Sequence, residues 1–311
     1  MVAVFESLLP VFLVVALGWA LRRCGVISRE QWEGVEQLGF WVLFPVLLFH
    51  ALINADLAAL SLDALIVSYL AALVIIFVLL FLLNVARGRI ISMDGPTYSS
   101  VFQTTSRWNA FIALAVMDKY AGAEGLALVA LVIALTVLPL NVINVLVVTR
   151  TVAREGSGWR HTLAATARNP MVLGAFTGLA FNLLAVPVYE PVLVAVDLVA
   201  QAGLAIGLLT VGAALRIRSV FRPRVEMLYG LLGKSVLFPL LVLGFGLAAG
   251  MSGVPLVAAM ACATTPAAAH GFIVARMMGG DADLYATTAA AQTLLGMVSM
   301  PFFLWLALVS A

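Results

Sequence analysis

A cluster of polar side chains surrounds Arg107, in the stretch QTTSRWNAF. The hydroxyls of Thr104, Thr105 and Ser106 precede the arginine, and the amide of Asn109 follows it. A guanidinium presents a planar fork of N–H donors that matches a carboxylate, and neighbouring hydroxyls can complete the hydrogen bonds of an anion. These residues therefore predict a binding site for an anionic substrate.

A second polar cluster, ATTPAAAH, carries Thr264 and Thr265 directly before Pro266. Proline lacks a backbone donor and disfavours helix at the preceding residue, while hydroxyls can satisfy the backbone groups that a break leaves free. Sliding the sequence along itself by 159 residues, the difference between positions 266 and 107, lays TTSR on ATTP. Both clusters are predicted to interrupt helices at corresponding places in two halves of the chain.

Further polar residues are candidates for ion coupling or for a polar path through the protein. His270 and Asp197 could take up and release a proton, and the others are Lys234, His50, Asn141 and Gln292. Each has a structural alternative. His270 could satisfy a carbonyl at the break, Asp197 could pair with a neighbour, and the amides could bond an adjacent helix.

The two buried cations also have structural alternatives. Arg107 lies midway between Asp94 and Asp118, so it is central in its segment, where it could instead pair with an acidic side chain or with free carbonyls. Lys234 follows Glu226 closely enough that its stem could extend to the cytoplasmic interface.

These residues are embedded in a chain with the composition of an integral membrane protein. The sequence is 64% hydrophobic and 10% charged, with a mean hydropathy of +1.13, far from the roughly 25% charged residues of soluble domains. A net charge of +2 without basic, aromatic-rich patches gives no indication of a nucleic-acid partner. The two cysteines, Cys24 and Cys262, are not expected to form a disulfide.

Ten apolar stretches are long enough to cross a bilayer as helices, which takes about 20 residues. They run over residues 4–21, 37–54, 64–86, 95–117, 123–149, 169–185, 191–215, 227–250, 254–276 and 284–309. The first stretch has Glu6 and no Lys or Arg at its start, and Arg22 and Arg23 follow it, which is the reverse of a signal peptide's charge order, so we expect it to be retained.

The basic residues predict the orientation of these stretches. The loops after the first, third, fifth, seventh and ninth stretches hold all 17 Lys and Arg residues except Arg107, Lys119 and Lys234. Because basic loops stay in the cytoplasm, both termini are predicted to lie outside it.

The division into halves predicts an all-α fold of two inverted repeats, residues 1–150 and 151–311. Each half holds five stretches, and an odd number makes the second half enter the membrane in the opposite orientation. Inverted repeats with broken helices near the midplane are typical of secondary transporters. The sequence contains no HExxH, GxGD or DDxxD motif, so we do not expect an enzyme.

The placement of three segments resembles the bacterial auxin efflux carrier family. They are the basic central loop RTVAREGSGWRHTLAATARNP, the stretch SRWNAFIAL, similar to the family's Arg-x-Asn segment, and the proline-broken CATTPAAAHGFIVA. The resemblance covers nearly the whole chain and places it in the superfamily of bile-acid symporters and sodium/proton antiporters.

The resemblance implies a bacterial plasma (inner) membrane carrier with an elevator-type, alternating-access mechanism. Helices four and nine would cross within a transport domain of helices 3–5 and 8–10, and helices 1, 2, 6 and 7 would form a scaffold that can dimerise. The implied substrate is a small organic anion such as malonate, moved without a cofactor but with possible coupling to protons or sodium. The alternatives are a cation/proton antiporter of the same fold, a channel or a membrane receptor. The chain lacks the long loop and the fourth-helix proline of plant members, which argues against auxin itself.

Overall fold

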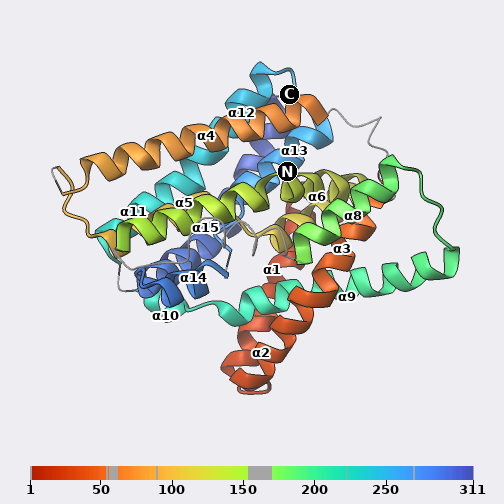
Figure 1. Ribbon diagram of the computed structural model, residues 1–311, viewed down its shortest axis with the longest axis horizontal. Coiled ribbons are helices and arrows are strands. Elements are labelled where there is room, and N and C mark those ends of the chain that lie inside the picture. Colours follow the sequence, from red (N-terminus) through yellow and green to blue (C-terminus); the bar gives the residue numbers. More distant parts are fainter. Residues whose placement is uncertain are drawn as a thin grey trace. The chain divides into compact units, whose positions relative to one another are not determined.

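The computed structural model describes residues 2–53, 55, 62–88, 90–152, 170–221, 223–268 and 270–310. Within these residues the chain is almost entirely helical and contains no β-strand, only an isolated bridge between Arg87 and Ile91 (Figure 1). Each of the ten predicted stretches overlaps a helix or an interrupted helix.

Six helical segments of the described chain are long and apolar enough to cross a membrane. They are Glu30–Ile53, Asp63–Ala86, Gly95–Val152, Glu190–Ala214, Val225–Ala248 and Ala282–Ser310, and two shorter apolar helices cover Leu173–Leu183 and Gly253–Thr264. Helix length and composition therefore agree with a multi-pass membrane protein.

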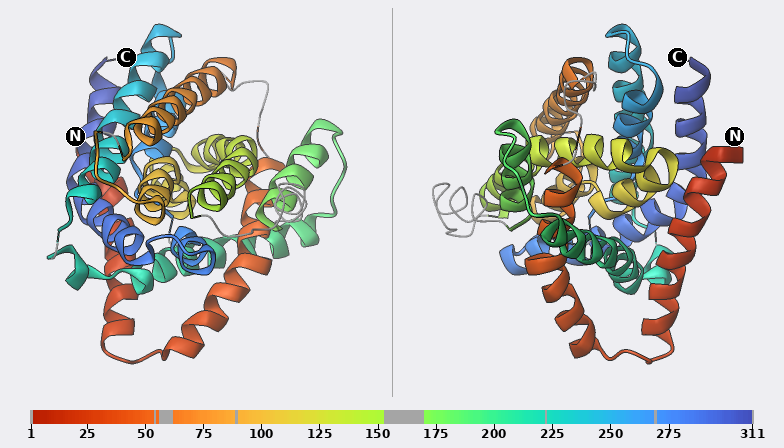
Figure 2. Two further views of the ribbon diagram at one scale, coloured as in Figure 1. Left: turned by 60° about the vertical axis from the view of Figure 1, so that its left-hand side comes forward. Right: turned by 90° about the vertical axis from the view of Figure 1, so that its right-hand side faces the viewer.

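The chain divides into two compact units, each assembled from distant parts of the sequence. The first comprises Met1–Leu60, Phe111–Leu138 and Ala164–Leu215. Its helices are α1 (Val2–Arg23), α2 (Arg29–Leu38), the π-helical turn η1 (Gly39–Leu43), α3 (Phe44–Ile53), the larger part of α6 (Ala110–Val152), α8 (Pro170–Leu183) and α9 (Glu190–Ala214). Figure 2 shows α1 and α2 joined by a short turn at the bottom of the right-hand view.

Glycines allow the helices of the first unit to pack with their backbones in contact. A Cβ at Gly212 on α9 would lie 1.8 Å from the carbonyl oxygen of Val15 on α1, and one at Gly18 would lie 2.1 Å from that of Leu209. Gly174 on α8 packs similarly against Pro45 on α3. Such contacts through small residues are the usual means of association of helices in a membrane.

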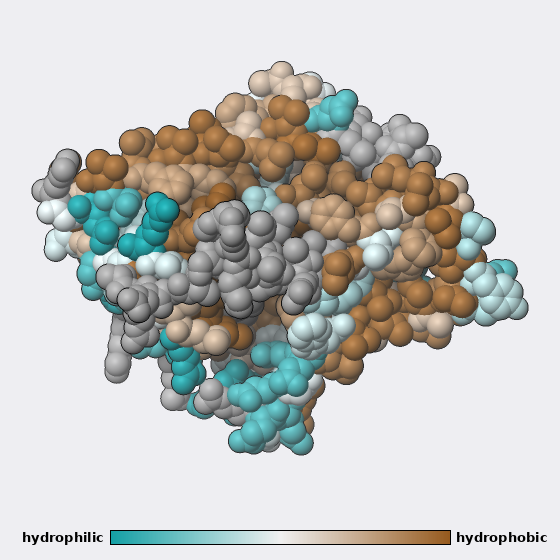
Figure 3. All heavy atoms as spheres, in the orientation of Figure 1, coloured by the Kyte–Doolittle hydropathy of each residue, from teal (hydrophilic) through white to brown (hydrophobic). Residues whose placement is uncertain are grey.

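The second unit comprises Ser61–Ala110, Pro139–Leu163 and Arg216–Ala311. Its helices are α4 (Leu62–Ala86), α5 (Gly95–Ser106), the last part of α6 (Ala110–Val152), α10 (Ile217–Val220), α11 (Val225–Leu232), the π-helical turn η2 (Gly233–Leu237), α12 (Phe238–Ala248), α13 (Gly253–Thr264), α14 (His270–Met278) and α15 (Ala282–Ser310). Helix α5 packs against α11 and α15, and α4 packs against α12 (Figures 1 and 2). Figure 3 shows a largely hydrophobic surface over α4, as expected for contact with lipid, and the exposed apolar side chains of this helix include Val67 and Leu82.

Two prolines explain the π-helical turns. Pro45 and Pro239 each follow a phenylalanine whose N–H bonds to the carbonyl five residues earlier, Phe44 to Gly39 and Phe238 to Gly233. A proline ring has no N–H and clashes with the carbonyl four residues before it, and the wider turn relieves this clash.

Candidate functional site

Both predicted helix breaks are present in the structure. Helix α5 ends at Ser106, Arg107 is extended with φ −76° and ψ 153°, and α6 begins at Ala110. Helix α13 ends at Thr264, Thr265 is extended with φ −63° and ψ 146°, and the next helix begins at His270.

The two breaks lie against each other inside the second unit. The backbone N–H of Asn109 donates to the Oγ1 of Thr265 over 3.3 Å, and both residues are buried. The polar residues predicted from two distant parts of the sequence therefore form one site. A helix begins at each break, α6 at Ala110 and α14 at His270. The N-terminus of each helix carries partial positive charge, which therefore lies at the break.

Arg107 is buried at this site, with 5% of its surface exposed, and its hydrogen bonds go to neutral amides. Its Nη1 donates to Asn141 Oδ1 over 2.8 Å and its Nε to Gln103 Oε1 over 3.3 Å. Its Nη2 and the Nε2 of Gln103 are buried and have no hydrogen-bond partner among the residues that the structure describes. Among the described residues no carboxylate pairs with Arg107.

The hydroxyls beside the breaks donate to carbonyls of their own helices. Thr104 bonds to Ser100, Thr105 to Val101, Ser106 to Phe102, Thr264 to Met260 and Thr265 to Cys262, over distances of 2.7–3.0 Å. Their oxygens can still accept hydrogen bonds, as Thr265 does from Asn109. To donate to an anion, these hydroxyls would have to rotate away from the helix carbonyls.

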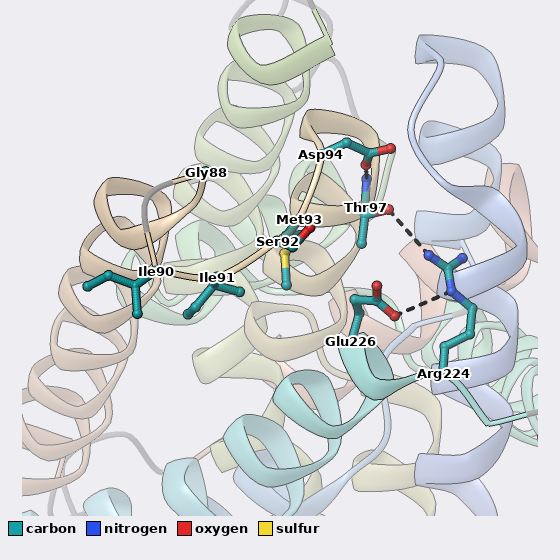
Figure 4. A pocket seen from close by; sticks show the side chains of 9 residues that line it. All are labelled: Gly88, Ile90, Ile91, Ser92, Met93, Asp94, Thr97, Arg224 and Glu226. Carbon is teal, nitrogen blue, oxygen red and sulfur yellow. Dashed lines mark hydrogen bonds and ion pairs between the residues drawn. The ribbon is translucent and has the colours of Figure 1, made fainter.

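A separate pocket of about 600 Å³ lies near the N-terminus of α5 (Figure 4). Its charged side chains are engaged with one another or with the helix terminus. Arg224 pairs with Glu226 and with Asp281, and the Oδ1 of Asp94 accepts the N–H of Thr97. The described residues that line this pocket therefore include no charge that is both buried and free, in contrast to Arg107.

The family of the chain follows from a comparison with protein-family models. The model described as "Membrane transport protein" matches residues 3–155 and 159–304, nearly the full length. The chain belongs to the auxin efflux carrier family. No curated protein sequence matches it significantly. Since this is a family of transporters, we refer to the chain below as the carrier.

Lys234 of the carrier is fully buried in η2, and within the described part of the chain its Nζ has no hydrogen-bond partner. The ammonium lies over the ring of Phe238, 4.7 Å from the ring centroid. Our alternative prediction, that its stem carries the charge to the interface, is wrong. The π-helical turn directs the side chain into the unit, which the spacing from Glu226 could not indicate.

The remaining candidates fall in different places. In the first unit, His50 Nε2 lies 3.5 Å from the Oδ1 of Asp197, whose Oδ2 accepts from Gln201. Asn141 bonds to Arg107, and Gln292 bonds to both breaks. The side chain of His270 lies outside the described part of the structure.

Sequence reasoning missed two residues at the site of the carrier, Gln103 and Tyr285. Gln103 contacts Arg107 from one turn earlier, a spacing that places both on one helix face and was available in the sequence. Asn144 accepts a hydrogen bond from Ser106, and Tyr285 donates to the carbonyl of Ala268. Asn144 and Tyr285 come from other helices, and only tertiary packing brings them to the breaks.

Proposed function

We propose that the carrier is a secondary transporter for a small organic anion, such as malonate or another small carboxylate. The observation that supports this most strongly is the buried guanidinium of Arg107, which has a free Nη2 and no acidic partner among the described residues. Removing a charge from water costs several kcal/mol unless a partner compensates. A substrate carboxylate would provide that partner and could accept two N–H groups of the fork at once.

The rest of the site favours the same sign of charge. The unpaired Nε2 of Gln103 and the helix N-termini at Ala110 and His270 all attract an anion. A cation/proton antiporter would instead need carboxylates at the breaks. The described residues from Gln103 to Asn109 and from Thr264 to Ala268 include none.

The proposed mechanism is alternating access of the elevator type. In this proposal residues 1–150 and 151–311 are inverted repeats, helices 1, 2, 6 and 7 form a scaffold that can dimerise, and helices 3–5 and 8–10 move the substrate. We place the carrier in the plasma (inner) membrane and expect proton coupling or movement driven by the membrane potential. Sodium coupling is the alternative.

Uptake into proteoliposomes tests the function. Labelled mono- and dicarboxylates are offered in turn, with pH and sodium gradients imposed separately, and at least one carboxylate should accumulate. With that substrate, Arg107→Ala should lose affinity by about tenfold to a hundredfold, the effect of removing a charge-assisted bond. Arg107→Lys should lose less affinity than Arg107→Ala, because it keeps the positive charge. It should still bind more weakly than the parent, because it lacks the planar fork of donors.

The control is Arg150→Ala, which removes an exposed arginine near the end of α6 and should transport like the parent. A folded Arg107→Ala protein with unchanged affinity would show that the anion binds elsewhere. A strict sodium requirement without any response to pH would reject proton coupling.

A further inference from the structure

Gln292 on α15 connects three other segments of the second unit through one side chain. Its Oε1 accepts the N–H of Ala267 over 2.9 Å, and its Nε2 donates to the carbonyls of Thr104, over 3.0 Å, and Gly230, over 2.9 Å. Only 1% of the residue is exposed. The single acceptor atom and both N–H groups of the amide are therefore engaged.

Two of these backbone groups are left free by the helix breaks. Thr104 lies in the last turn of α5, where carbonyls have no partner within the helix. Ala267 supplies the first backbone N–H after Pro266. A buried backbone group without a partner is destabilising, and Gln292 supplies a partner at both breaks where water cannot reach.

Tyr285 extends this connection along the same face of α15. It lies about two helical turns before Gln292, and its hydroxyl donates to the carbonyl of Ala268 over 2.6 Å. Helix α15 thus holds two successive residues of the segment between α13 and α14. Through Gln292 it also holds the end of α5, so the relative position of the two breaks depends on this helix.

We propose that Gln292 is a positioning residue that fixes the two helix breaks in the spacing the anion site requires. Gln292 does not bond to Arg107; it acts through the backbone at Thr104 and Ala267. This inference rests on the proposed function, because the site it positions is the anion site around Arg107. It favours the structural alternative for Gln292, a bond to neighbouring segments, over a polar path, since the whole amide is occupied by backbone groups.

Two substitutions separate the hydrogen bonds of Gln292 from its volume. Gln292→Met keeps a similar shape and makes none of the three bonds. Gln292→Glu is almost the same size, but an ionised carboxylate can only accept, and it would face the carbonyls of Thr104 and Gly230. A protonated Glu regains one donor. Lowering the pH should therefore partly restore the affinity of Gln292→Glu for the carboxylate, and the affinity of the parent should not rise comparably.

Thr293→Val is the matched control. Thr293 is the next residue on α15, is also buried, and donates to the carbonyl of Ala289 within the same helix over 2.9 Å. The substitution removes a buried hydrogen bond from the same helix without touching either break.

The experiment measures the affinity of the purified carrier for the best labelled carboxylate of the uptake panel, from neutral to acidic pH. Gln292→Met should bind the carboxylate about tenfold more weakly. This loss equals the net free energy of one or two hydrogen bonds, because water compensates part of each bond in the unfolded chain. Gln292→Glu should bind weakly at neutral pH and recover as the pH falls. Thr293→Val should bind the carboxylate like the parent. Tyr285→Phe should lose less affinity than Gln292→Met.

Hydrogen exchange at Ala267 provides a readout that needs no substrate. The N–H of Ala267 should exchange faster in Gln292→Met than in the parent and be unchanged in Thr293→Val. Parent-like affinity in Gln292→Met, or an equal loss in Thr293→Val, would overturn the inference. If Gln292→Met does not fold, the affinity of Gln292→Glu as a function of pH tests the inference instead. An affinity that does not change with pH would overturn the inference. A parent that binds no carboxylate refutes the anion function instead.

Discussion

At the scale of single residues, the decisive feature is a buried arginine whose partners are amides. Asn141 and Gln103 offer Arg107 neutral oxygens, which stabilise its orientation without neutralising its charge. A structural ion pair would occupy the fork permanently, whereas amide partners leave the charge available to a bound anion. We therefore expect the side chain at position 141 to control the proposed binding of substrate by Arg107.

Asn141→Asp tests this directly, because it places a carboxylate 2.8 Å from Nη1 with almost no change in shape. The new ion pair should make the folded protein at least as stable as the parent and weaken carboxylate binding by more than about tenfold, since substrate must then displace a bound carboxylate. Affinity and melting temperature are measured on the same preparation. Asn141→Leu, which adds no charge, should lose much less affinity. Parent-like binding by Asn141→Asp would exclude Arg107 from the site.

At the scale of helices, packing in the first unit depends on close backbone contact. Gly212→Ala would place a methyl group 1.8 Å from the carbonyl oxygen of Val15, so α1 and α9 would have to separate. We expect a loss of more than about 2 kcal/mol in the free energy of unfolding. Gly244→Ala on α12 is the control, because its Cβ would meet nothing within 4 Å. It should be neutral or stabilising by up to about 1 kcal/mol. Equal melting temperatures for the two variants would contradict the packing argument.

Asp94 caps the N-terminus of α5, just before the candidate span that begins at Gly95. The backbone N–H of Thr97, followed by the Thr97 hydroxyl, holds the pKa of Asp94 below its ordinary value. The ionised carboxylate therefore stabilises the fold at neutral pH, and this contribution is lost as the pH falls through the lowered pKa.

Asp94→Ala should lower the melting temperature at neutral pH, corresponding to about 1 kcal/mol for a lost cap. The difference from the parent should shrink as the pH falls below about 3.9, where the carboxyl group of the unfolded chain is already protonated. Asp94→Asn keeps a capping oxygen and should show little of this pH dependence. A difference that is constant from neutral to acidic pH would rule out the charged cap.

At the scale of the whole molecule, the distribution of basic residues predicts the topology. All Lys and Arg residues except Arg107, Lys119 and Lys234 lie in alternate loops, so both termini should be outside the cytoplasm. Reporters fused before Met1 and after Ala311 should be accessible only from that side. A reporter in the central basic loop, which contains Arg154 and Arg160, should be accessible only from the cytoplasm. Cytoplasmic labelling of either terminus would contradict the inverted repeats.

The sequence by itself determined the membrane character, the helices and both helix breaks. These features depend on local chemistry: long apolar runs, the missing N–H of Pro266, and a charge at Arg107 flanked by hydroxyls that bond to their own helix. It did not predict the π-helical turns, because a proline can kink, end or widen a helix, and packing selects among these outcomes.

Only the tertiary structure decided the partners of the polar residues. Arg107 contacts Asn141, and Gln292 contacts Thr104 and Ala267, across sequence separations that no local pattern encodes. The same holds for Lys234, whose distance from Glu226 along the chain is compatible with the interface or with the interior. Burial and pairing of a polar side chain depend on which helices surround it, and long-range packing sets these neighbours while the local sequence sets the helices.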